Sequence, residues 1–244
     1  MYYAQSYRTK WHDTDADGLM RPSMLVAYMQ ETANLQLREW GCDVNSLHND
    51  RRMGFLLSRI ALRIDEPLHA YEDIEVRTWC PPSRALTFVR CFSVHRNGVT
   101  VAEAISHWGL MDLNAGKLVR VSDFPQDYFP TGDMPDESTL PHRVHIPAGT
   151  VLGEVGERRI VYSDLDFNRH MNNTKYPDMI CDFLPDLSGR RVRSLAMSYL
   201  REAAYGDTLT VLRASVSRDG SEGYLLRTVR PDGAVCMEAE VELV

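Results

Sequence analysis

The chain has 244 residues, a formal net charge of −7, and 44% hydrophobic and 25% charged residues. This length allows one large domain or two small ones with a real core. The acidic balance argues against non-specific nucleic-acid binding, which needs a basic surface. No apolar run approaches the roughly 18 residues that span a membrane. The first residues lack the features of a signal peptide, and the five scattered cysteines form no C-x-x-C pair, so we expect reduced thiols in a cytoplasmic protein.

The first part of the chain is predicted to be a strand followed by a long helix. Residues 6–13 are expected to be the strand, which enters a polar loop at 13–18. Pro22 suits the first turn of a helix, and Gly41 suits its end. Apolar residues recur between them at helical spacing, at Met24, Leu25, Tyr28, Met29 and Leu35. Residues 43–53 are polar and are predicted to be irregular.

Antiparallel strands are predicted next, at 55–64, 74–79, 86–95 and 99–111. Residues 67–73 form the turn after the first of them. Asn97-Gly98 is a strong signal for a tight hairpin between the last two. Residues 114–117 close a further turn. A linker follows at 123–150, where five prolines, Pro125, Pro130, Pro135, Pro141 and Pro147, exclude a helix or a central strand.

The most informative stretch is residues 162–176, YSDLDFNRHMNNTKY. Asp166, Asn168 and His170 alternate, so an extended backbone would place all three side chains on one side. A carboxylate, an amide and an imidazole brought together can position and activate a water molecule. A helix is predicted to follow, with Asn172, Asn173 or Thr174 as its cap and Pro177 in its first turn. Its free N–H groups would offer donors for a developing oxyanion.

The second half repeats the first. Asp13, Asp15 and Asp17 align with Asp164, Asp166 and Asn168 at an offset of 151 (164 − 13). Farther along, Glu103-Ala104 aligns with Glu238-Ala239 at an offset of 135 (238 − 103). The first copy therefore has 16 extra residues (151 − 135), which we place within 39–53. The pattern indicates a duplicated strand-helix-sheet unit, with domains at 1–122 and 151–244 joined by the linker.

The two copies differ in their chemistry. Leu19 aligns with His170, Asp17 with Asn168, and Pro67 with Glu202. The first copy therefore lacks the imidazole and the second carboxylate. We infer one working site per chain, in the second copy, and predict that the first copy supplies an acyl tunnel lined by Met24, Leu25, Met29, Met53 and Phe55.

The motif Asp-x-Asn-x-His-x-Asn-Asn-x-x-Tyr at 166–176 resembles that of the acyl-acyl-carrier-protein thioesterases, which release fatty acids from the carrier protein in plants and bacteria. The resemblance extends to Tyr199-Leu200-Arg201-Glu202 and, more loosely, to 11–15. It implies an α+β fold of two tandem hot-dog domains, each a curved antiparallel sheet around a long central helix. It also implies hydrolysis of a fatty acyl thioester, with Asp166, Asn168, His170 and Glu202 as the catalytic residues and an acidic carrier protein as partner.

In this mechanism no protein nucleophile or cofactor is needed. Either Glu202 or Asp166 takes a proton from water, Asn168 and His170 hold water and thioester in register, and His170 protonates the departing thiolate. Which carboxylate is the base stays open. The chain lacks G-x-S-x-G, H-E-x-x-H and phosphate-binding glycine motifs. No metal is expected, since Asn168 is a poor ligand and no further histidine has useful spacing.

An acidic carrier should dock on a basic surface, and the densest basic set is Arg190, Arg191 and Arg193, with Lys175 and Arg201. Three alternatives remain: an acyl-coenzyme A thioesterase, a hot-dog enoyl-thioester hydratase, and a non-catalytic acyl-binding protein. The hydratase should not need Glu202, and a pure binder gains nothing from grouping desolvated polar side chains. Whether two chains form a homodimer is left open.

Overall fold

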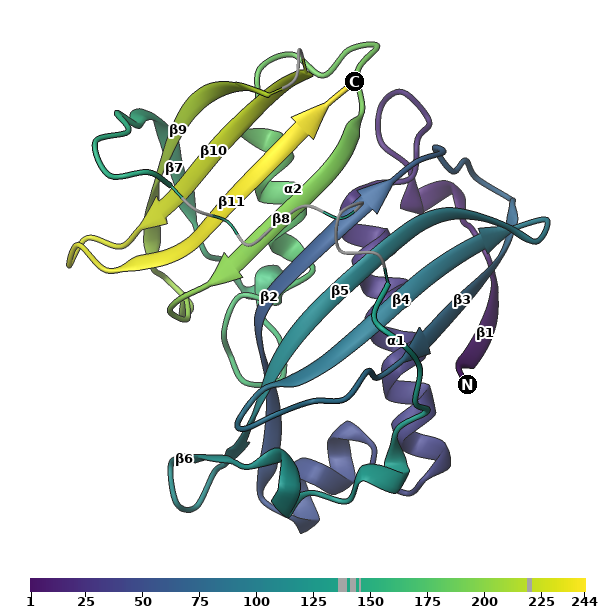
Figure 1. The fold of residues 1–244 in the computed structure, drawn as a ribbon. Coiled ribbons are helices and arrows are strands. Elements are labelled where there is room, and N and C mark those ends of the chain that lie inside the picture. Colours follow the sequence, from purple (N-terminus) through teal and green to yellow (C-terminus); the bar gives the residue numbers. More distant parts are fainter. Residues whose placement is uncertain (136–139, 141–143, 145, 219–220) are drawn as a thin grey trace.

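The computed structural model describes residues 1–135, 140, 144, 146–218 and 221–244. Its strands form one sheet in the order β1-β3-β4-β5-β2-β8-β11-β10-β9-β7, with short β6 beside β5 (Figure 1). The strands of the first half are β1 (Tyr3–Arg8), β2 (Met53–Ile64), β3 (Asp73–Trp79), β4 (Phe88–Arg96), β5 (Val99–Asp112) and β6 (Lys117–Val119). Those of the second half are β7 (Gly153–Arg159), β8 (Val192–Tyr199), β9 (Thr208–Arg218), β10 (Ser221–Val229) and β11 (Val235–Leu243).

The two halves are joined edge to edge by β2 and β8, which pair antiparallel at the centre of the sheet. On either side of this joint the strands follow the same order, β2-β5-β4-β3-β1 in one half and β8-β11-β10-β9-β7 in the other. Figure 1 shows the two halves side by side, each with its helix on the same side of the sheet. The predicted duplication is therefore visible in the topology.

Hydrogen bonds confirm the alignment of the two copies. The Met20 N–H donates to the Leu68 carbonyl at 2.7 Å, and the Met171 N–H donates to the Ala203 carbonyl at 2.8 Å. Met20 and Met171 differ by 151, whereas Leu68 and Ala203 differ by 135, as predicted from the sequence. Pro67 therefore occupies the position of Glu202.

The first helix, α1 (Pro22–Glu39), has 18 residues and begins and ends as predicted. Proline at its start has no N–H to lose, and Gly41 after its end adopts the left-handed conformation, with φ of 65°. The second helix, α2 (Lys175–Asp182), has only 8 residues, so the expectation of a long helix fails in the second half. Its end is explained by Pro185, which disfavours helical backbone at the residue before it.

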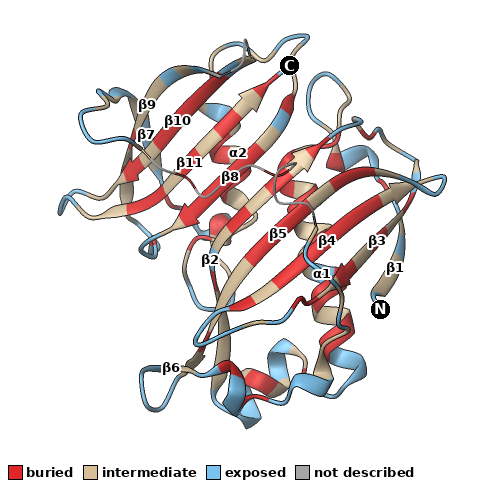
Figure 2. Ribbon diagram, in the orientation of Figure 1, coloured by how far each residue is buried: buried red, intermediate tan, exposed pale blue. Residues whose placement is uncertain are grey.

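One large core lies between the sheet and both helices and includes fully buried residues of each half, such as Leu62, Met29, Met179 and Met197. Figure 2 shows buried residues along the central strands and on both helices. A smaller aromatic cluster lies at one end of the first half, around Phe88, Phe124 and Leu110. The five cysteines are free thiols. No helix of the described residues is long and apolar enough to cross a membrane.

Several local expectations need correction. The first strand is Tyr3–Arg8, and residues Trp11–Asp13 form a 3-10 helix because the Asp13 carboxylate accepts the Lys10 N–H. Residues 43–53 are not irregular throughout, since Ser46–Asp50 forms one turn of π-helix that buries Leu47. The predicted turn at 67–73 joins β2 to β3, which are not neighbours in the sheet. Part of the predicted linker, including Pro141, lies outside the described residues.

Candidate active site

The central motif is a tight turn rather than a strand. Tyr162–Asp164 is a 3-10 helix, and the Asp166 Oδ1 atom then accepts the backbone N–H groups of Asn168 at 2.8 Å and His170 at 3.2 Å. An Asp side chain that bonds its own following backbone replaces the strand ladder. The prediction of an extended segment is therefore wrong. Asp166 shapes the turn, and Asn168 is exposed on it. His170 lies at the end of the turn and is half-buried.

His170 meets Glu202 at the end of this turn. The His170 Nε2 atom lies 3.3 Å from Glu202 Oε2, and the two side chains are 34% and 63% exposed. Residues 200 and 201 follow the end of β8, where both N–H groups donate to the Cys236 carbonyl. The Cys236 thiol in turn lies 3.8 Å from the Glu202 carbonyl. The fold therefore brings together two side chains that are 32 residues apart in sequence, as a pair within reach of solvent.

Tyr199 ties the start of α2 to β8. Its hydroxyl donates to the Asn173 carbonyl at 3.1 Å, and its ring meets that of Tyr176 edge-on, with centroids 5.2 Å apart. Burial raises the pKa of both phenols, so they stay neutral. The sequence contained Tyr199 in the Tyr199-Leu200-Arg201-Glu202 segment but gave no sign of this anchoring role.

The expected oxyanion donors at the α2 N-terminus are mostly occupied. The Asn172 side chain accepts the Thr174 N–H at 2.9 Å, and the Asn172 carbonyl accepts that of Lys175 at 2.9 Å. Pro177 has no N–H. Among the first-turn donors this leaves Tyr176, so the helix end is a weaker oxyanion site than the sequence suggested.

The first copy builds the same turn without the reactive pair. The Asp15 Oδ1 atom accepts the N–H groups of Asp17 and Leu19, both at 3.0 Å. Leu19 and Pro67 then stand where His170 and Glu202 stand in the second copy. They line a groove of about 450 Å³ together with Cys181 of α2 and Arg191. The turn is thus a feature of the fold, and the imidazole–carboxylate pair belongs to the second copy.

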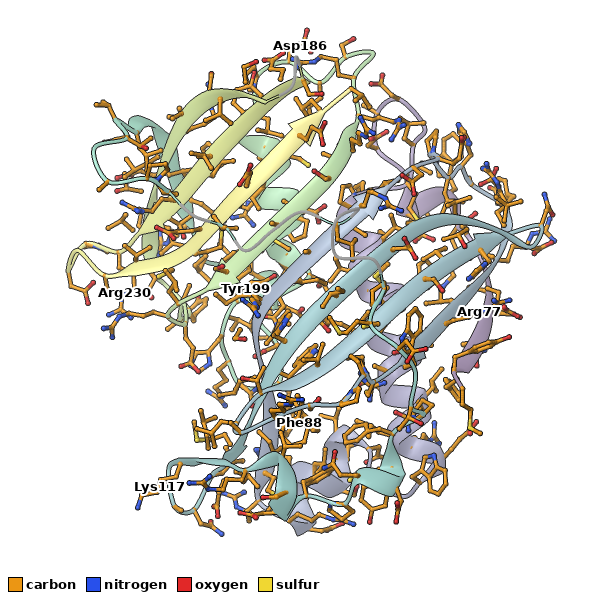
Figure 3. The ribbon with its side chains drawn as sticks, viewed as in Figure 1. Arg77, Phe88, Lys117, Asp186, Tyr199 and Arg230 are labelled. Atoms are coloured by element: carbon orange, nitrogen blue, oxygen red, sulfur yellow. The ribbon has the colours of Figure 1, made fainter. Side chains whose placement is uncertain are left out.

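An apolar cavity of about 350 Å³ lies in the first half. Its described lining comes from α1, from β2, β4 and β5, and from the segments after β3 and β6. Phe88, on its wall, is labelled in Figure 3. Of the predicted tunnel residues, Phe55 lines this cavity. Leu25 and Met29 are fully buried in the main core, Met24 packs against that core, and Met53 packs against the aromatic cluster.

The predicted docking arginines lie far from the His170–Glu202 pair. They precede or begin β8, whereas Glu202 follows its other end, and this eight-residue strand is roughly 25 Å long at about 3.3 Å per residue. Arg190 is paired with Glu222, and Arg193 lies 3.7 Å from Glu242. Arg191 donates to the carbonyls of Ile64 and Asp65. By contrast, exposed Arg169 and Arg201 are sequence neighbours of the pair.

Two further residues were missed by the sequence reasoning. His48, in the extra segment of the first copy, meets exposed Phe167 of the catalytic turn edge-on at 4.7 Å. Gln30 of α1 has a buried amide nitrogen without a hydrogen-bond partner among the described residues. The contact of His48 with Phe167 could not be inferred from spacing, because it depends on how the two halves pack. Within the described residues no group of His, Cys, Asp and Glu is arranged to hold a metal ion.

Solved structures share this architecture. The crystal structure of an acyl-ACP thioesterase from Bacteroides thetaiotaomicron matches with a TM-score of 0.86 at 24% identity, over 100% of this chain and 98% of that one. The 12:0-ACP thioesterase from Umbellularia californica matches with a TM-score of 0.84 at 16% identity, over 100% of this chain and 94% of that one. The fold is therefore that of two tandem hot-dog domains, in the α+β class, as predicted.

Models of protein families identify the family to which this tandem hot-dog chain belongs. Those for the N-terminal and C-terminal domains of acyl-ACP thioesterases match residues 1–128 and 154–243, so the chain belongs to the acyl-ACP thioesterase family. The palmitoyl-acyl carrier protein thioesterase of Cuphea hookeriana is 22% identical over 99% of this chain, which spans 62% of that protein. Oleoyl-acyl carrier protein thioesterase 1 of Arabidopsis thaliana is 24% identical over 60% of this chain. The chain spans 44% of the length of that relative.

Proposed function

We propose that this protein hydrolyses the thioester of a fatty acyl-acyl carrier protein, with water activated by the Glu202–His170 pair. The observation that carries the proposal is the 3.3 Å contact between His170 Nε2 and Glu202 Oε2. It brings a carboxylate and an imidazole together at the end of the turn, and the equivalent positions of the first copy carry Leu19 and Pro67. Family membership supports the choice of thioester hydrolysis.

Each side chain has a role that follows from its contacts. Glu202 accepts a proton from water, and the resulting hydroxide adds to the thioester carbonyl carbon. When the carbon–sulfur bond breaks, the proton passes from Glu202 through His170 to the thiolate. Asp166 is less suited to act as the base, because one of its oxygens already accepts two backbone N–H groups. Its part is to hold the turn that orients His170. Asn168, which is exposed on the same turn, holds the water and the thioester in register together with His170.

The oxyanion donor in this proposal is Gln30. At the offset of 151 (181 − 30) its counterpart is Cys181, which lines the groove of the first copy beside Leu19 and Pro67. Burial raises the pKa of Cys181 to about 12, and the carboxylates of Asp178, Asp182 and Asp15 add to the effect, which places it near the first-copy turn. From this correspondence we infer that Gln30 faces His170 and Glu202 in the second copy. Its amide nitrogen, which has no hydrogen-bond partner among the described residues, would then bond the developing oxyanion.

The acyl chain follows α1 away from this site. Gln30, Ala33, Asn34 and Leu37 have the spacing of one helix face, and the last three line the 350 Å³ cavity. From residue 30 to residue 37 the helix rises roughly 10 Å. An apolar cavity of about 150 Å³ holds a benzene molecule, so the cavity here has room for an aliphatic chain of roughly a dozen carbons.

An acyl-coenzyme A thioesterase would use the same catalytic groups and differs only in what carries the thiol. A hydratase is less well supported, because the Glu202 carboxylate directly contacts His170. A non-catalytic acyl-binding protein would have no use for this pair. The cytoplasmic location remains a prediction from the sequence, since the chloroplast is named for the plant relatives only.

The test is mass spectrometry of products after the protein is mixed with panels of acyl-carrier-protein and acyl-coenzyme A thioesters. We expect free fatty acid from carrier-bound substrates at a higher kcat/KM than from the coenzyme A series. Glu202→Gln and His170→Ala should each lower kcat by about 10² or more. The control is Pro67→Ala, at the equivalent position of the first copy. Full activity of folded Glu202→Gln would rule out this mechanism.

A further inference from the structure

Arg90 is a buried cation without a carboxylate partner among the described residues. It lies on β4, is 6% exposed, and burial lowers its pKa. Its guanidinium donates to Gln36 Oε1 at 2.9 Å and to Thr78 Oγ1 at 3.3 Å, and lies over the Phe129 ring at 5.4 Å. All three partners are neutral. A buried charge is normally paired with an opposite charge, because taking it out of water is otherwise costly.

Among the described residues, the partners of Arg90 use only part of its hydrogen-bonding capacity. A guanidinium has five N–H donors in a planar fork, and this shape suits the two oxygens of a carboxylate. The Arg90 side chain lies on the face of the sheet that α1 covers. Neighbouring strand residues point to opposite faces, and Cys91 packs with Leu140 on the face away from α1, whereas Arg90 bonds Gln36 of α1.

Arg90 also lines the apolar cavity of about 350 Å³. The described lining is otherwise aliphatic, aromatic or neutral polar, with Ala33, Leu37, Phe55, Phe88 and Trp108 among its apolar members. Of these described lining residues, Arg90 is the charged one. An apolar cavity that contains a single fixed cation matches a ligand with an aliphatic body and one anionic end.

We propose that this cavity binds an aliphatic chain whose terminal carboxylate contacts Arg90. Two sources can supply that chemistry. A free fatty acid can enter with its carboxylate first, and would then act as a product inhibitor. Alternatively, an acyl thioester can carry a second carboxylate at its far end, a substrate class that rests on the proposed function. The cavity and the cation are the same in both cases.

Binding is tested on the whole protein by calorimetry with decanoate and decanol, which share a chain and differ in charge. We expect decanoate to bind at least tenfold more tightly than decanol. Arg90→Met should weaken decanoate binding at least tenfold and leave decanol unchanged, whereas Arg77→Met on neighbouring β3 should change neither. Equal binding of the two ligands to the unaltered protein would overturn the proposal, and this comparison does not depend on whether Arg90→Met folds. An unchanged ratio in folded Arg90→Met would also overturn it.

Turnover then separates the two sources. A higher kcat/KM for the mono-thioester of dodecanedioic acid than for the dodecanoyl thioester, lost in Arg90→Met, identifies the substrate as the source. Inhibition by decanoate without that preference identifies the free acid. The absence of both effects in an active enzyme would contradict the proposal. If the protein proves to hydrolyse no thioester, the proposed function fails, and the calorimetric comparison still decides whether Arg90 binds a carboxylate.

Discussion

Ala61 of β2 pairs directly with Ala196 of β8, and each is the counterpart of the other at the offset of 135 (196 − 61). The two flanking pairs, Leu62 with Leu195 and Ile60 with Met197, are counterparts of each other, because Leu62 corresponds to Met197 (197 − 62 = 135) and Ile60 to Leu195 (195 − 60 = 135). A pseudo-twofold axis therefore passes through the centre of the sheet between these two alanines. It relates the His170–Glu202 site of the second half to the groove beside Leu19 and Pro67 in the first.

The axis provides a matched pair of variants, Asp166→Ala and Asp15→Ala. Each removes a carboxylate that accepts two backbone N–H groups, so each should lower the free energy of unfolding by about 1–2 kcal/mol. Only Asp166→Ala should lower kcat, by about 10², because only its turn positions an imidazole. Urea unfolding and steady-state kinetics check this. If Asp15→Ala abolished turnover while Asp166→Ala retained it, the chemistry would lie in the first copy.

Much of the fold could be predicted from the sequence because its signals are local. Pro22 and Gly41 marked the ends of α1, and Asn97-Gly98 marked the hairpin, where both residues have positive φ. The repeat offsets aligned Pro67 with Glu202. The alternation at Asp166, in contrast, predicted a strand, because spacing alone does not show that a carboxylate will bond the backbone that follows it.

The contacts that complete the site are non-local and could not be predicted. The ring contact of His48 with Phe167 and the pairing of β2 with β8 both depend on the packing of one half against the other. The early end of α2 does have a local signal in Pro185. That signal was outweighed by the expectation that the two copies have helices of equal length.

Carrier docking can be assigned by comparing two sets of charge reversals. Arg169→Glu with Arg201→Glu should raise KM for carrier-bound substrate several-fold and spare kcat, because these exposed cations adjoin the catalytic pair. The effect should shrink at high salt, since surface charges are screened over about 8–10 Å at physiological ionic strength. Reversal of Arg190 and Arg193, which have carboxylate partners at the other end of β8, should leave KM unchanged. If reversal of Arg190 and Arg193 raised KM and reversal of Arg169 and Arg201 did not, the result would support docking at Arg190, Arg191 and Arg193.

Chain length should respond to Ala33, which lines the cavity. Ala33→Leu adds three carbons to the wall, and each methylene contact is worth about 0.8 kcal/mol. The product profile should therefore shift toward chains roughly two carbons shorter, as measured by gas chromatography. Ala27→Leu, on α1 but away from the cavity lining, is the control.

Met29→Trp should instead lower Tm, because Met29 is fully buried in the core and an oversized side chain there costs about 1–3 kcal/mol.

His107 should make the fold sensitive to acid. Burial, and secondarily the charge of Arg59, lowers its pKa from 6.5 to about 4, and its Nδ1 atom is buried without a partner among the described residues. Between these values the unfolded chain binds the proton more readily than the folded protein does, so stability falls as pH decreases through this window. His107→Gln should reduce the loss of Tm between pH 7 and pH 4.5, whereas His12→Gln, at an exposed position, should not. An unchanged pH dependence in His107→Gln would remove this residue as a cause.

The role proposed for Gln30 separates catalysis from stability. Its amide nitrogen is buried without a partner in the described part of the chain, so Gln30→Leu removes an unsatisfied polar group, and the free energy of unfolding should stay the same or rise. If the amide holds the oxyanion, the same variant should lower kcat by about 10²–10³ with little change in KM, because the bond strengthens in the transition state. Cys181→Leu, at the equivalent position of α2, should leave kcat within a few-fold. A Gln30→Leu variant that is both stable and fully active would place the oxyanion elsewhere, with the Tyr176 N–H as the next donor to test.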